Sequence, residues 1–373
     1  MMMNRQYDMD WIRVLATMAV FLYHISMFFN PFPWHVKNND VSSTGVLIFT
    51  LFNGAWIMPI FFVVSGISVF YALERRKGGE FLKERFIRLG IPLLLGVFIL
   101  SPPQVFIERL TNNQFSGSLF EFFPHYFDGL YLDIGGVGNF AFVGLHLWYC
   151  LVLLVFSLLT FPLFKNVRGH NVSFRTIHFV LLPLGLFVIS LVDTVNLGGW
   201  DLHFYLVLFL YGYYYFSKKE FKKAVKVTFP LHLITAIVTS IVYIVLFIEF
   251  HPQTWISEVI FDFVRVVNCW SWLLSIFNLA DKYLSFTNVK LKYAGEASMP
   301  FYIIHQPVIV LLGYSIYDLS WSIPVKVIFL TVLSFLTIMF IFHFIIRPNN
   351  VLRLLFGIKS KKVNMNSEIK QQM

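Results

Sequence analysis

The hydrophobic positions of this chain gather in long apolar segments and do not alternate with polar ones. A helix needs ~20 apolar residues to cross the hydrocarbon core of a bilayer. Segments near or above that length lie at residues 11–29, 46–73, 89–106, 142–164, 177–192, 202–216, 227–250, 256–279, 299–317 and 325–346. This pattern predicts an all-α polytopic membrane protein with about ten transmembrane helices.

The basic residues alternate between the connecting loops. Of the 29 Lys and Arg residues, 24 lie in one set of loops that includes both chain ends, while the alternate set holds only Lys37 and Arg109. Basic residues mark the cytoplasmic side of a membrane protein. We therefore expect an even number of spans and both termini in the cytoplasm. The net charge of +9 then reflects membrane topology, and we expect membrane lipid and no nucleic acid among the partners.

Composition supports the same class. The chain is 57% hydrophobic and 13% charged, whereas soluble domains carry about 25% charged residues. Its two cysteines, Cys150 and Cys269, each lie in an apolar segment, which excludes a disulfide scaffold and offers no spaced metal site. We expect one membrane domain over residues 1–350 and a basic cytoplasmic tail over residues 351–373.

One extracytoplasmic loop, residues 107–141, is much longer than the others. It is rich in Phe and Tyr and contains the run Gly135-Gly136-Val137-Gly138. Long loops in compact folds are usually functional or disordered, and this one is too aromatic for disorder. Two interpretations remain open: a surface for carbohydrate rings, or a re-entrant cap that packs on the helices.

The first span contains two ionisable residues, which are costly within a membrane and usually functional. Arg13 lies near its cytoplasmic end, and His24 follows eleven residues later, or roughly 16 Å along the axis. Eleven residues are close to three turns, so the two side chains project from nearly the same face. The structural interpretation is a snorkelling arginine and a helix-bonded histidine; the functional one is a polar line across the membrane.

Other polar candidates are scattered. Arg85 and Arg88 share a helix face before the third span, where guanidinium groups would hold phosphate. Asp262 and Arg265 are spaced as a neutralising pair, and His305 lies in the ninth span facing either ligand or water.

Five stretches stand out along the chain: Asp10-Trp11-Ile12-Arg13 with His24, Phe61 to Gly66, Arg85-x-x-Arg88, His146-Leu147-Trp148-Tyr149 and Tyr302-Ile303-Ile304-His305-Gln306-Pro307. They resemble, in the expected order, the signatures of the acyltransferase-3 family of bacterial integral membrane acyltransferases. The stretch from Lys83 to Leu89, with Ser101-Pro102-Pro103-Gln104, is similar to the MdoC/OpgC-like branch of that family, which includes glucan succinyltransferases.

The resemblance implies transfer of an acetyl or succinyl group from cytosolic acyl-CoA to a hydroxyl of an extracytoplasmic glycan or related envelope molecule. It places the protein in the bacterial cytoplasmic membrane, with His24 as general base; direct transfer and an acyl-histidine intermediate both stay open. The roles that it implies are catalytic for His24 and Asp10, donor-binding for Arg13, Arg85 and Arg88, and substrate-binding for His146, Trp148, Tyr302 and His305.

Two other functions compete with this one. A multi-pass transporter or flippase for a glycan or lipid-linked sugar also needs polar residues at depth, although no internal repeat is evident between the two halves of the chain. A structural or sensory membrane protein does not predict the alignment of Arg13 with His24.

Overall fold

The computed structural model describes residues 6–167, 173–250 and 252–360, and these residues are overwhelmingly helical. Among them, eight helical segments are long and apolar enough to cross a membrane, which confirms the predicted all-α polytopic class. Two more of the ten predicted spans are present as shorter helices, α9 and α10 with its extension η5. The elements are α1 (Tyr7–Phe29), α2 (Thr44–Gly54), α3 (Ile57–Arg75), α4 (Gly78–Arg85), η1 (Phe86–Gly90), α5 (Ile91–Leu95), η2 (Gly96–Leu100), α6 (Ser101–Thr111), α7 (Leu119–His125), η3 (Leu145–Leu147), α8 (Trp148–Asn166), α9 (His178–Ser190), β1 (Asn196–Leu197), β2 (Trp200–Asp201), α10 (Leu202–Tyr211), η5 (Gly212–Phe216), α11 (Lys219–Val245), η6 (Leu246–Phe250), α12 (Trp255–Tyr283), α13 (Val289–Ile316), α14 (Ile323–Phe340), η7 (Ile341–Ile346) and α15 (Asn350–Leu355).

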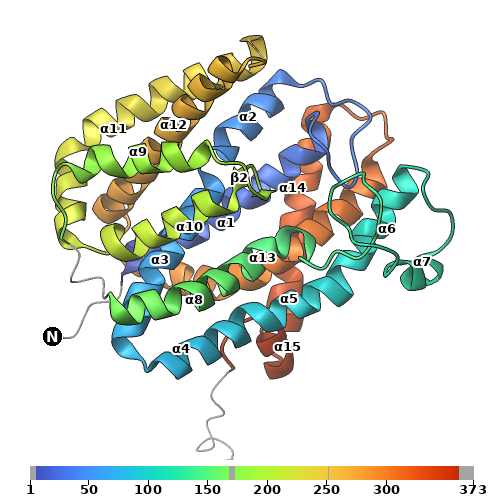
Figure 1. Cartoon of the computed structure of the whole chain (residues 1–373). Coiled ribbons are helices and arrows are strands. Elements are labelled where there is room, and N and C mark those ends of the chain that lie inside the picture. Colours follow the sequence, from blue (N-terminus) through green and yellow to red (C-terminus); the bar gives the residue numbers. More distant parts are fainter. Residues whose placement is uncertain (1–5, 168–172, 251, 361–373) are drawn as a thin grey trace, which may run out of the picture.

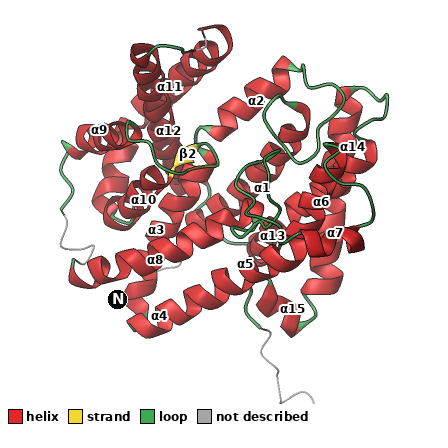
Figure 2. Ribbon diagram, turned by 45° about the vertical axis from the view of Figure 1, so that its right-hand side comes forward, coloured by secondary structure: helices red, strands yellow, loops and turns green. Residues whose placement is uncertain are grey.

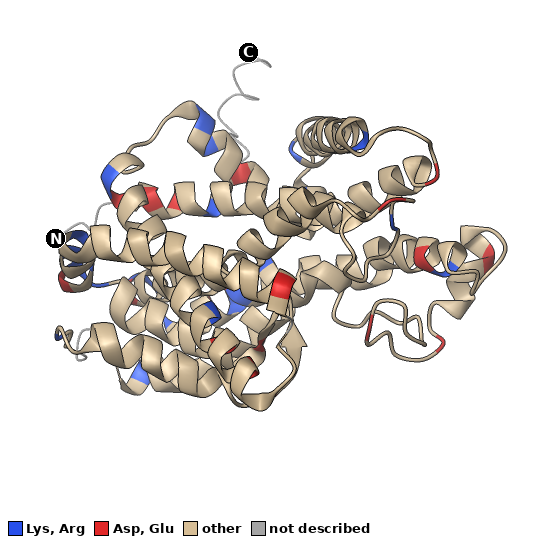
Figure 3. Cartoon of the chain, turned by 90° about the horizontal axis from the view of Figure 1, so that it is seen from above, with Lys and Arg blue, Asp and Glu red and all other residues tan. Residues whose placement is uncertain are grey.

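The helices α1 and α13 form the centre of the bundle. Helix α1 packs against α13, α3, α2, α12 and α14, and α13 also packs against α14 and α6. Helices α11 and α12 pair with each other and, with α9, form a group at one flank (Figures 1 and 2). Most of the length of the helices is free of charged residues (Figure 3). Polar side chains at the contact between α1 and α13, such as His305, are therefore enclosed by the rest of the protein.

The third predicted span begins earlier than its hydropathy indicates. A continuous helix runs from Gly78 to Thr111, so Arg85 and Arg88 lie within it and not in a loop before it. Two π-helical turns, η1 and η2, interrupt its α-geometry. Each turn precedes proline (Pro92, then Pro102), whose missing N–H removes an i→i−4 hydrogen bond and so disturbs the regular ladder.

A close backbone contact joins α3 to η5. A Cβ atom at Gly66 would overlap the carbonyl oxygen of Phe209, and one at Gly212 would overlap that of Val63. Gly66 ends one of the stretches that carry the family resemblance. The structure thus gives that glycine a packing role, because only glycine lets the two backbones approach so closely.

The long loop that the sequence predicts to be extracytoplasmic is a folded cap. Because α6 extends to Thr111, the cap begins later than predicted and runs over residues 112–144, at the opposite end of the bundle from the N-terminus (Figures 1 and 2). It has its own small core, in which Phe122, Tyr126 and Tyr131 pack on Val105 of α6. The Tyr126 hydroxyl donates to the carbonyl oxygen of Val97 at 2.7 Å, so the cap folds back along the side of the third span.

The C-terminal tail also departs from the expected boundary. Of the predicted tail, residues 351–360 are described, and they fold against the bundle through α15. Arg353 is buried and donates to Glu296 on α13 at 2.7 Å. Gly357 adopts a φ of +69° and lies against the Arg88 carbonyl, a position where a Cβ would clash. The rest of the predicted tail, residues 361–373, lies outside the described residues.

Candidate active site

The first helix aims both of its predicted polar residues into the bundle. His24 meets α13, and Arg13 meets α3, where its guanidinium donates to the Ser68 hydroxyl at 2.5 Å. Both side chains thus contact neighbouring helices at different depths of the bundle, as their spacing predicts, although the Arg13 side chain stays partly exposed.

His24 forms a dyad with His305. His24 Nδ1 lies 2.6 Å from His305 Nε2, and the two rings stack with centroids 4.8 Å apart. His305 Nδ1 lies 2.6 Å from the carbonyl oxygen of Tyr302, one turn earlier on α13. On its other side His24 stacks on Trp34, with ring centroids 5.1 Å apart. The sequence left the partner of His305 open, and the structure supplies it.

The hydrogen bonds of the dyad fix its tautomers. A carbonyl oxygen can only accept, so His305 Nδ1 carries the hydrogen that is donated to Tyr302. When His305 is neutral, its Nε2 is an acceptor, and His24 Nδ1 must be the donor. The lone pair of His24 then lies on Nε2. Among the described residues none bonds this Nε2, and the His24 side chain keeps some accessible surface. The dyad presents one unpartnered basic nitrogen.

His146 is the third imidazole of this cluster. Its ring centroid lies 5.1 Å from that of His305 and 6.5 Å from that of His24. His146 Nε2 donates to the carbonyl oxygen of Ile303 at 3.0 Å, which leaves Nδ1 as an acceptor. That Nδ1 is buried and has no hydrogen-bond partner in the described part of the chain. Buried polar atoms without partners are rare, so His146 Nδ1 is a second vacant acceptor beside the dyad.

The two remaining predicted substrate residues have different positions. Tyr302 donates its hydroxyl to the backbone carbonyl of His146 at 2.5 Å and so holds η3 against α13. Trp148 instead lies in an aromatic cluster with Phe62 and Tyr205, and makes no ring contact with the dyad in the described structure. The structure therefore supports a positioning role for Tyr302 and does not bring Trp148 to the histidines.

A cluster of basic residues occupies the end of the bundle that is predicted to be cytoplasmic. We call Arg13, Arg85 and Arg88 the inner arginine cluster. Arg88 forms an ion pair with Glu84 at 3.1 Å, and Glu84 is shared with Arg76. The charge of Arg85 interacts with those of Arg13 and Arg88.

Arg85 stands out in this cluster. Its guanidinium lies over the ring of Phe81 at 5.2 Å but has no hydrogen bond or ion pair with any described residue. Nearby, the Tyr149 hydroxyl lies 2.7 Å from the Ser65 hydroxyl and interacts electrostatically with Arg85 and Arg13. The cluster thus holds a concentration of positive charge that the protein itself leaves partly uncompensated.

Asp10, which the resemblance implies to be catalytic, has a different position. It lies fourteen residues before His24 on the same helix, or about 21 Å along the axis, and it forms an ion pair with Arg13 at 3.3 Å. Asp10 therefore orients Arg13 and does not reach the dyad, because both residues belong to one regular helix.

Asp262 and Arg265 interact electrostatically, but the structure shows no hydrogen bond or direct ion pair between these two residues. The Arg265 guanidinium lies over the Trp200 ring at 3.8 Å and donates to the carbonyl oxygen of Gly199. It thereby holds the β1–β2 hairpin on α12. Cation–π stacking on tryptophan takes the place of the expected carboxylate.

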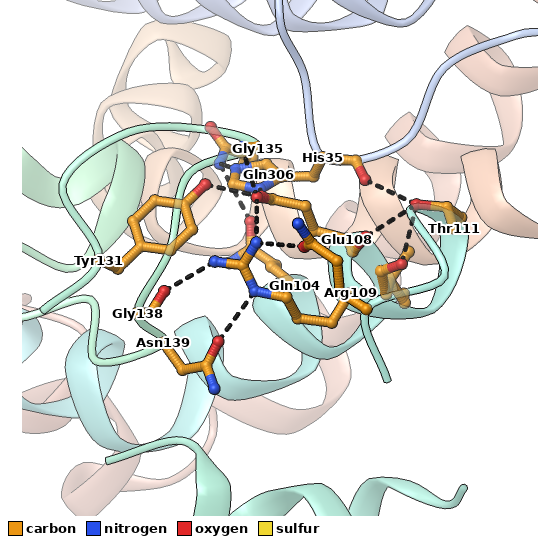
Figure 4. A network of polar contacts seen from close by, with 12 residues as sticks. His35, Gln104, Glu108, Arg109, Thr111, Tyr131, Gly135, Gly138, Asn139 and Gln306 are labelled. Atoms are coloured by element: carbon orange, nitrogen blue, oxygen red, sulfur yellow. Dashed lines mark hydrogen bonds and ion pairs between the residues drawn. The ribbon is translucent and has the colours of Figure 1, made fainter. Parts of the chain in front are cut away.

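A second polar site, which the sequence analysis missed, lies just beyond the dyad (Figure 4). Its centre is Glu108 of α6, which is fully buried. The Glu108 carboxylate accepts hydrogen bonds from His35 Nδ1 at 2.6 Å, the Tyr131 hydroxyl at 2.7 Å and the Gly135 N–H at 2.8 Å, and lies 3.6 Å from Arg109. Four donors surround one carboxylate.

This site is connected to the dyad through Gln306, the neighbour of His305. Gln306 Nε2 lies 3.1 Å from His35 Nε2 and donates to Gln104 Oε1 at 3.0 Å. We call His35, Gln104, Glu108, Tyr131 and Gln306 the outer network. A signal for it existed, since Gln104 and Glu108 lie at i and i+4 in an apolar helix, but nothing indicated that His35 would face them.

The cap is fastened to this network by Arg109. Its guanidinium donates to Asn139 at 2.9 Å, to the Gly138 carbonyl at 2.7 Å and to Gln114 at 2.6 Å. The glycine run noted in the sequence contributes at two points: the Gly138 carbonyl accepts from Arg109, and the Gly135 N–H donates to Glu108. Burial, reinforced by the Glu108 carboxylate, raises the pKa of Tyr131 far above its ordinary value, so this hydroxyl stays protonated as a donor.

The turn that carries Trp34 and His35 is held by two lysines. Lys37 Nζ donates to the carbonyls of Met27 at 2.6 Å and Phe32 at 2.8 Å, and burial lowers its pKa to about 8. Lys326 of α14 donates to Asn38 at 2.6 Å. These contacts fix the segment after α1 against the bundle, which places Trp34 on the dyad and His35 in the outer network.

The fold and this site together define a multi-pass membrane protein with a buried histidine cluster between an arginine-rich end and a capped end. Comparison with known proteins agrees. The family model described as "Acyltransferase domain" matches residues 6–343, so the chain belongs to the acyltransferase-3 family and is a membrane acyltransferase.

Relatives of known name support this assignment. The chain is 24% identical over 341 residues to Glucans biosynthesis protein C of Escherichia coli (strain K12), with 83% of each chain covered. It is 24% identical over 344 residues to the protein of the same name in Shigella dysenteriae serotype 1 (strain Sd197), again with 83% of each covered. No solved structure matches this chain.

Proposed function

We propose that this acyltransferase moves an acetyl or succinyl group from cytosolic acyl-CoA to a hydroxyl of an extracytoplasmic glycan or related envelope molecule, with His24 as general base. The observation that carries the proposal is the dyad, in which one imidazole nitrogen is free and its tautomer is fixed by a second histidine. A general base needs a lone pair that the protein itself does not use, and the free lone pair on His24 Nε2 supports that role.

The proposed step balances without any further reactant. His24 Nε2 accepts the proton of the acceptor hydroxyl while the hydroxyl oxygen attacks the thioester carbonyl. The C–S bond then breaks, and the leaving CoA thiolate takes the proton back from the His24 imidazolium. His305 stabilises that imidazolium by accepting from Nδ1, a role that an aspartate performs in a Ser-His-Asp triad.

Donor binding is assigned to the inner arginine cluster. Coenzyme A carries a pyrophosphate and a 3′-phosphate, and arginine binds phosphate through two parallel N–H···O bonds. Arg85 has no hydrogen bond or ion pair with a described residue beyond its contact with the Phe81 ring, so it is the residue best placed to bind a phosphate of the ligand. The acceptor is proposed to be a glucan because the similar proteins are named for glucan biosynthesis. A cytosolic donor implies the bacterial cytoplasmic membrane.

The test is an assay of purified protein in lipid vesicles with acetyl-CoA or succinyl-CoA and a glucan acceptor. Release of free thiol measures donor consumption, and mass spectrometry of the glucan measures acylation. His24→Ala should lower kcat at least about 100-fold, since general-base catalysis contributes about 10²–10⁴-fold. Donor affinity should be unchanged. Full acylation by His24→Ala would refute the base, and flux of a glycan across the vesicle without thiol release would indicate a transporter.

The role of His305 is tested by two matched substitutions. His305→Leu removes the acceptor for His24 Nδ1 and should lower kcat with little change in KM. His305→Gln keeps an acceptor oxygen and should recover part of that loss. A leucine variant and a glutamine variant with equal activity would remove His305 from the mechanism.

A further inference from the structure

The helix α7 of the cap and the turn after it have three distinct faces. Residues spaced three or four apart share a side of a helix. Phe122 and Tyr126 are buried in the core of the cap. A second side, which we call the polar face, carries Glu121, His125 and Asp128, all exposed.

The third side is apolar and exposed. It carries Phe120, Phe123 and Phe127, which are 88%, 47% and 50% exposed; we call these the phenylalanine face. Full burial of a phenylalanine side chain contributes about 1.5–3 kcal/mol, and each of these residues forgoes the exposed fraction of that free energy if it faces water. Contiguous exposed apolar residues on a folded surface usually mark a contact with a partner or a membrane.

The depth of the cap points to the membrane. Helix α7 packs against α6 of the third span. The hydroxyl of Tyr126, the residue after α7, reaches further back along this span, to the carbonyl of Val97, fourteen residues before the end of α6 at Thr111. At 1.5 Å per residue this is about 21 Å back from the end of that helix. The cap therefore descends along the bundle toward the bilayer.

An aromatic ladder joins the phenylalanine face to the outer surface of this span. The ring of Phe123 packs on Phe127 at 6.1 Å, Phe127 packs on Phe140 at 5.6 Å, and Phe140 packs on Phe98 at 6.3 Å. Phe98 belongs to the span itself and is 47% exposed beside Leu94. The apolar surface of the span thus continues without a break onto the cap.

We infer that the phenylalanine face inserts into the extracytoplasmic leaflet and contacts lipid acyl chains, so that the cap is anchored in the membrane. The polar face sets the orientation of α7 relative to the membrane, because it must face water. Glu121 accepts from the Ser118 N–H at 2.6 Å, and His125 lies 2.9 Å from Asp128, so these groups are satisfied at the water-facing side. An interfacial helix with aromatic residues on one face and polar residues on another lies in the plane of the membrane boundary.

The experiment places single cysteines in the full-length protein. The native Cys150 and Cys269 are buried and need no replacement. Phe120→Cys and Phe123→Cys sample the phenylalanine face, and Glu121→Cys and Asp128→Cys are matched controls one helical side away. Each is labelled with an environment-sensitive maleimide fluorophore in vesicles whose lipids carry bromine at defined depths of the acyl chain.

Labels at positions 120 and 123 should be blue-shifted and quenched several-fold more by brominated lipid than by aqueous iodide. Labels at 121 and 128 should show the opposite preference. Equal iodide quenching at all four positions would overturn the inference, and so would protection of the 120 label by added soluble glucan alone, which would identify a carbohydrate surface. All four residues are exposed, so the variants should fold, and thiol release from acyl-CoA at the rate of the unmodified protein checks this independently.

Discussion

The bundle has two polar regions, the inner arginine cluster and the outer network, which differ in how far their charges are compensated by neighbouring groups. In the inner arginine cluster Arg85 makes no hydrogen bond or ion pair with a described residue, and Arg13, Arg85 and Arg88 repel one another. In the outer network the single carboxylate of Glu108 is met by four donors. A buried charge must be paired or it destabilises the fold.

The difference separates structure from ligand binding. A network that is fully satisfied by the protein's own donors stabilises the fold and leaves nothing for a substrate. A cluster that keeps unpaired cations at an accessible end is complete only when an anion binds. The histidine dyad lies between the two, and like the inner cluster it keeps one functional atom free.

The largest expected effect comes from removing the carboxylate of the outer network. Glu108→Ala leaves His35, Tyr131 and the Gly135 N–H without their shared acceptor, and should lower the free energy of unfolding by about 3–5 kcal/mol. Thermal or denaturant unfolding in detergent would measure this loss. Glu108→Gln keeps an acceptor oxygen and should lose less. If Glu108→Ala instead kept the stability of the protein and weakened binding of the glucan substrate, the outer network would be a ligand-binding site and not a structural one.

A substitution in the inner arginine cluster should change the affinity for acyl-CoA and not the folding stability. Arg85→Ala should weaken acyl-CoA binding about 10-fold to 100-fold, because a charge-assisted hydrogen bond contributes about 1.5–3 kcal/mol. Calorimetric titration with the donor measures it. Lys83→Ala, an exposed cation two residues away on α4, is the control and should bind normally. Loss of folding stability in Arg85→Ala would mean that the arginine is structural.

Tyr131→Phe should have a smaller effect on the outer network. It removes one of four donors and should destabilise the protein by about 1 kcal/mol. Because the pKa of Tyr131 is raised in the folded state, its contribution is fully present below the ordinary tyrosine pKa of about 10 and declines at higher pH. The difference in unfolding free energy between the two proteins should therefore be constant from neutral pH to about 10 and narrow above it. A difference that already shrinks near neutral pH would contradict the proposed environment.

The smallest expected effect is that of salt. Raising ionic strength from about 0.01 M to 0.1 M shortens the Debye length from about 30 Å to 10 Å. Acyl-CoA affinity at the partly exposed arginines should fall a few-fold, while the unfolding midpoint, which depends on the buried outer network, should hardly change. If acyl-CoA affinity and the unfolding midpoint changed equally with salt, the proposed difference between a ligand-binding inner cluster and a structural outer network would be wrong.

The membrane architecture was largely predictable, because hydropathy and the distribution of Lys and Arg are local properties of each segment. The alignment of Arg13 with His24 followed from helical periodicity alone. The boundaries were less certain: Arg85 and Arg88 lie inside a helix because its polar first turns carry no hydropathy signal.

The contacts between distant segments were not predictable. His24 and His305 are 281 residues apart, and His35 and Glu108 are 73 apart. Trp148 and Asp10 were placed near the reaction because they belong to recognised stretches, yet sequence proximity to a motif does not say which neighbour a side chain faces. Only the packing of α1 on α13 and α6 decides it.

By itself the sequence determined that this is a multi-pass helical membrane protein of the acyltransferase-3 family, with a cation and an imidazole along one face of its first helix. Those properties reside in composition, period and short stretches. The tertiary structure decided which imidazole nitrogen is free, which carboxylate is saturated and how deep the cap descends. These three features depend on hydrogen bonds between segments that are distant in the sequence. The geometry of those bonds is set only when the helices pack against one another.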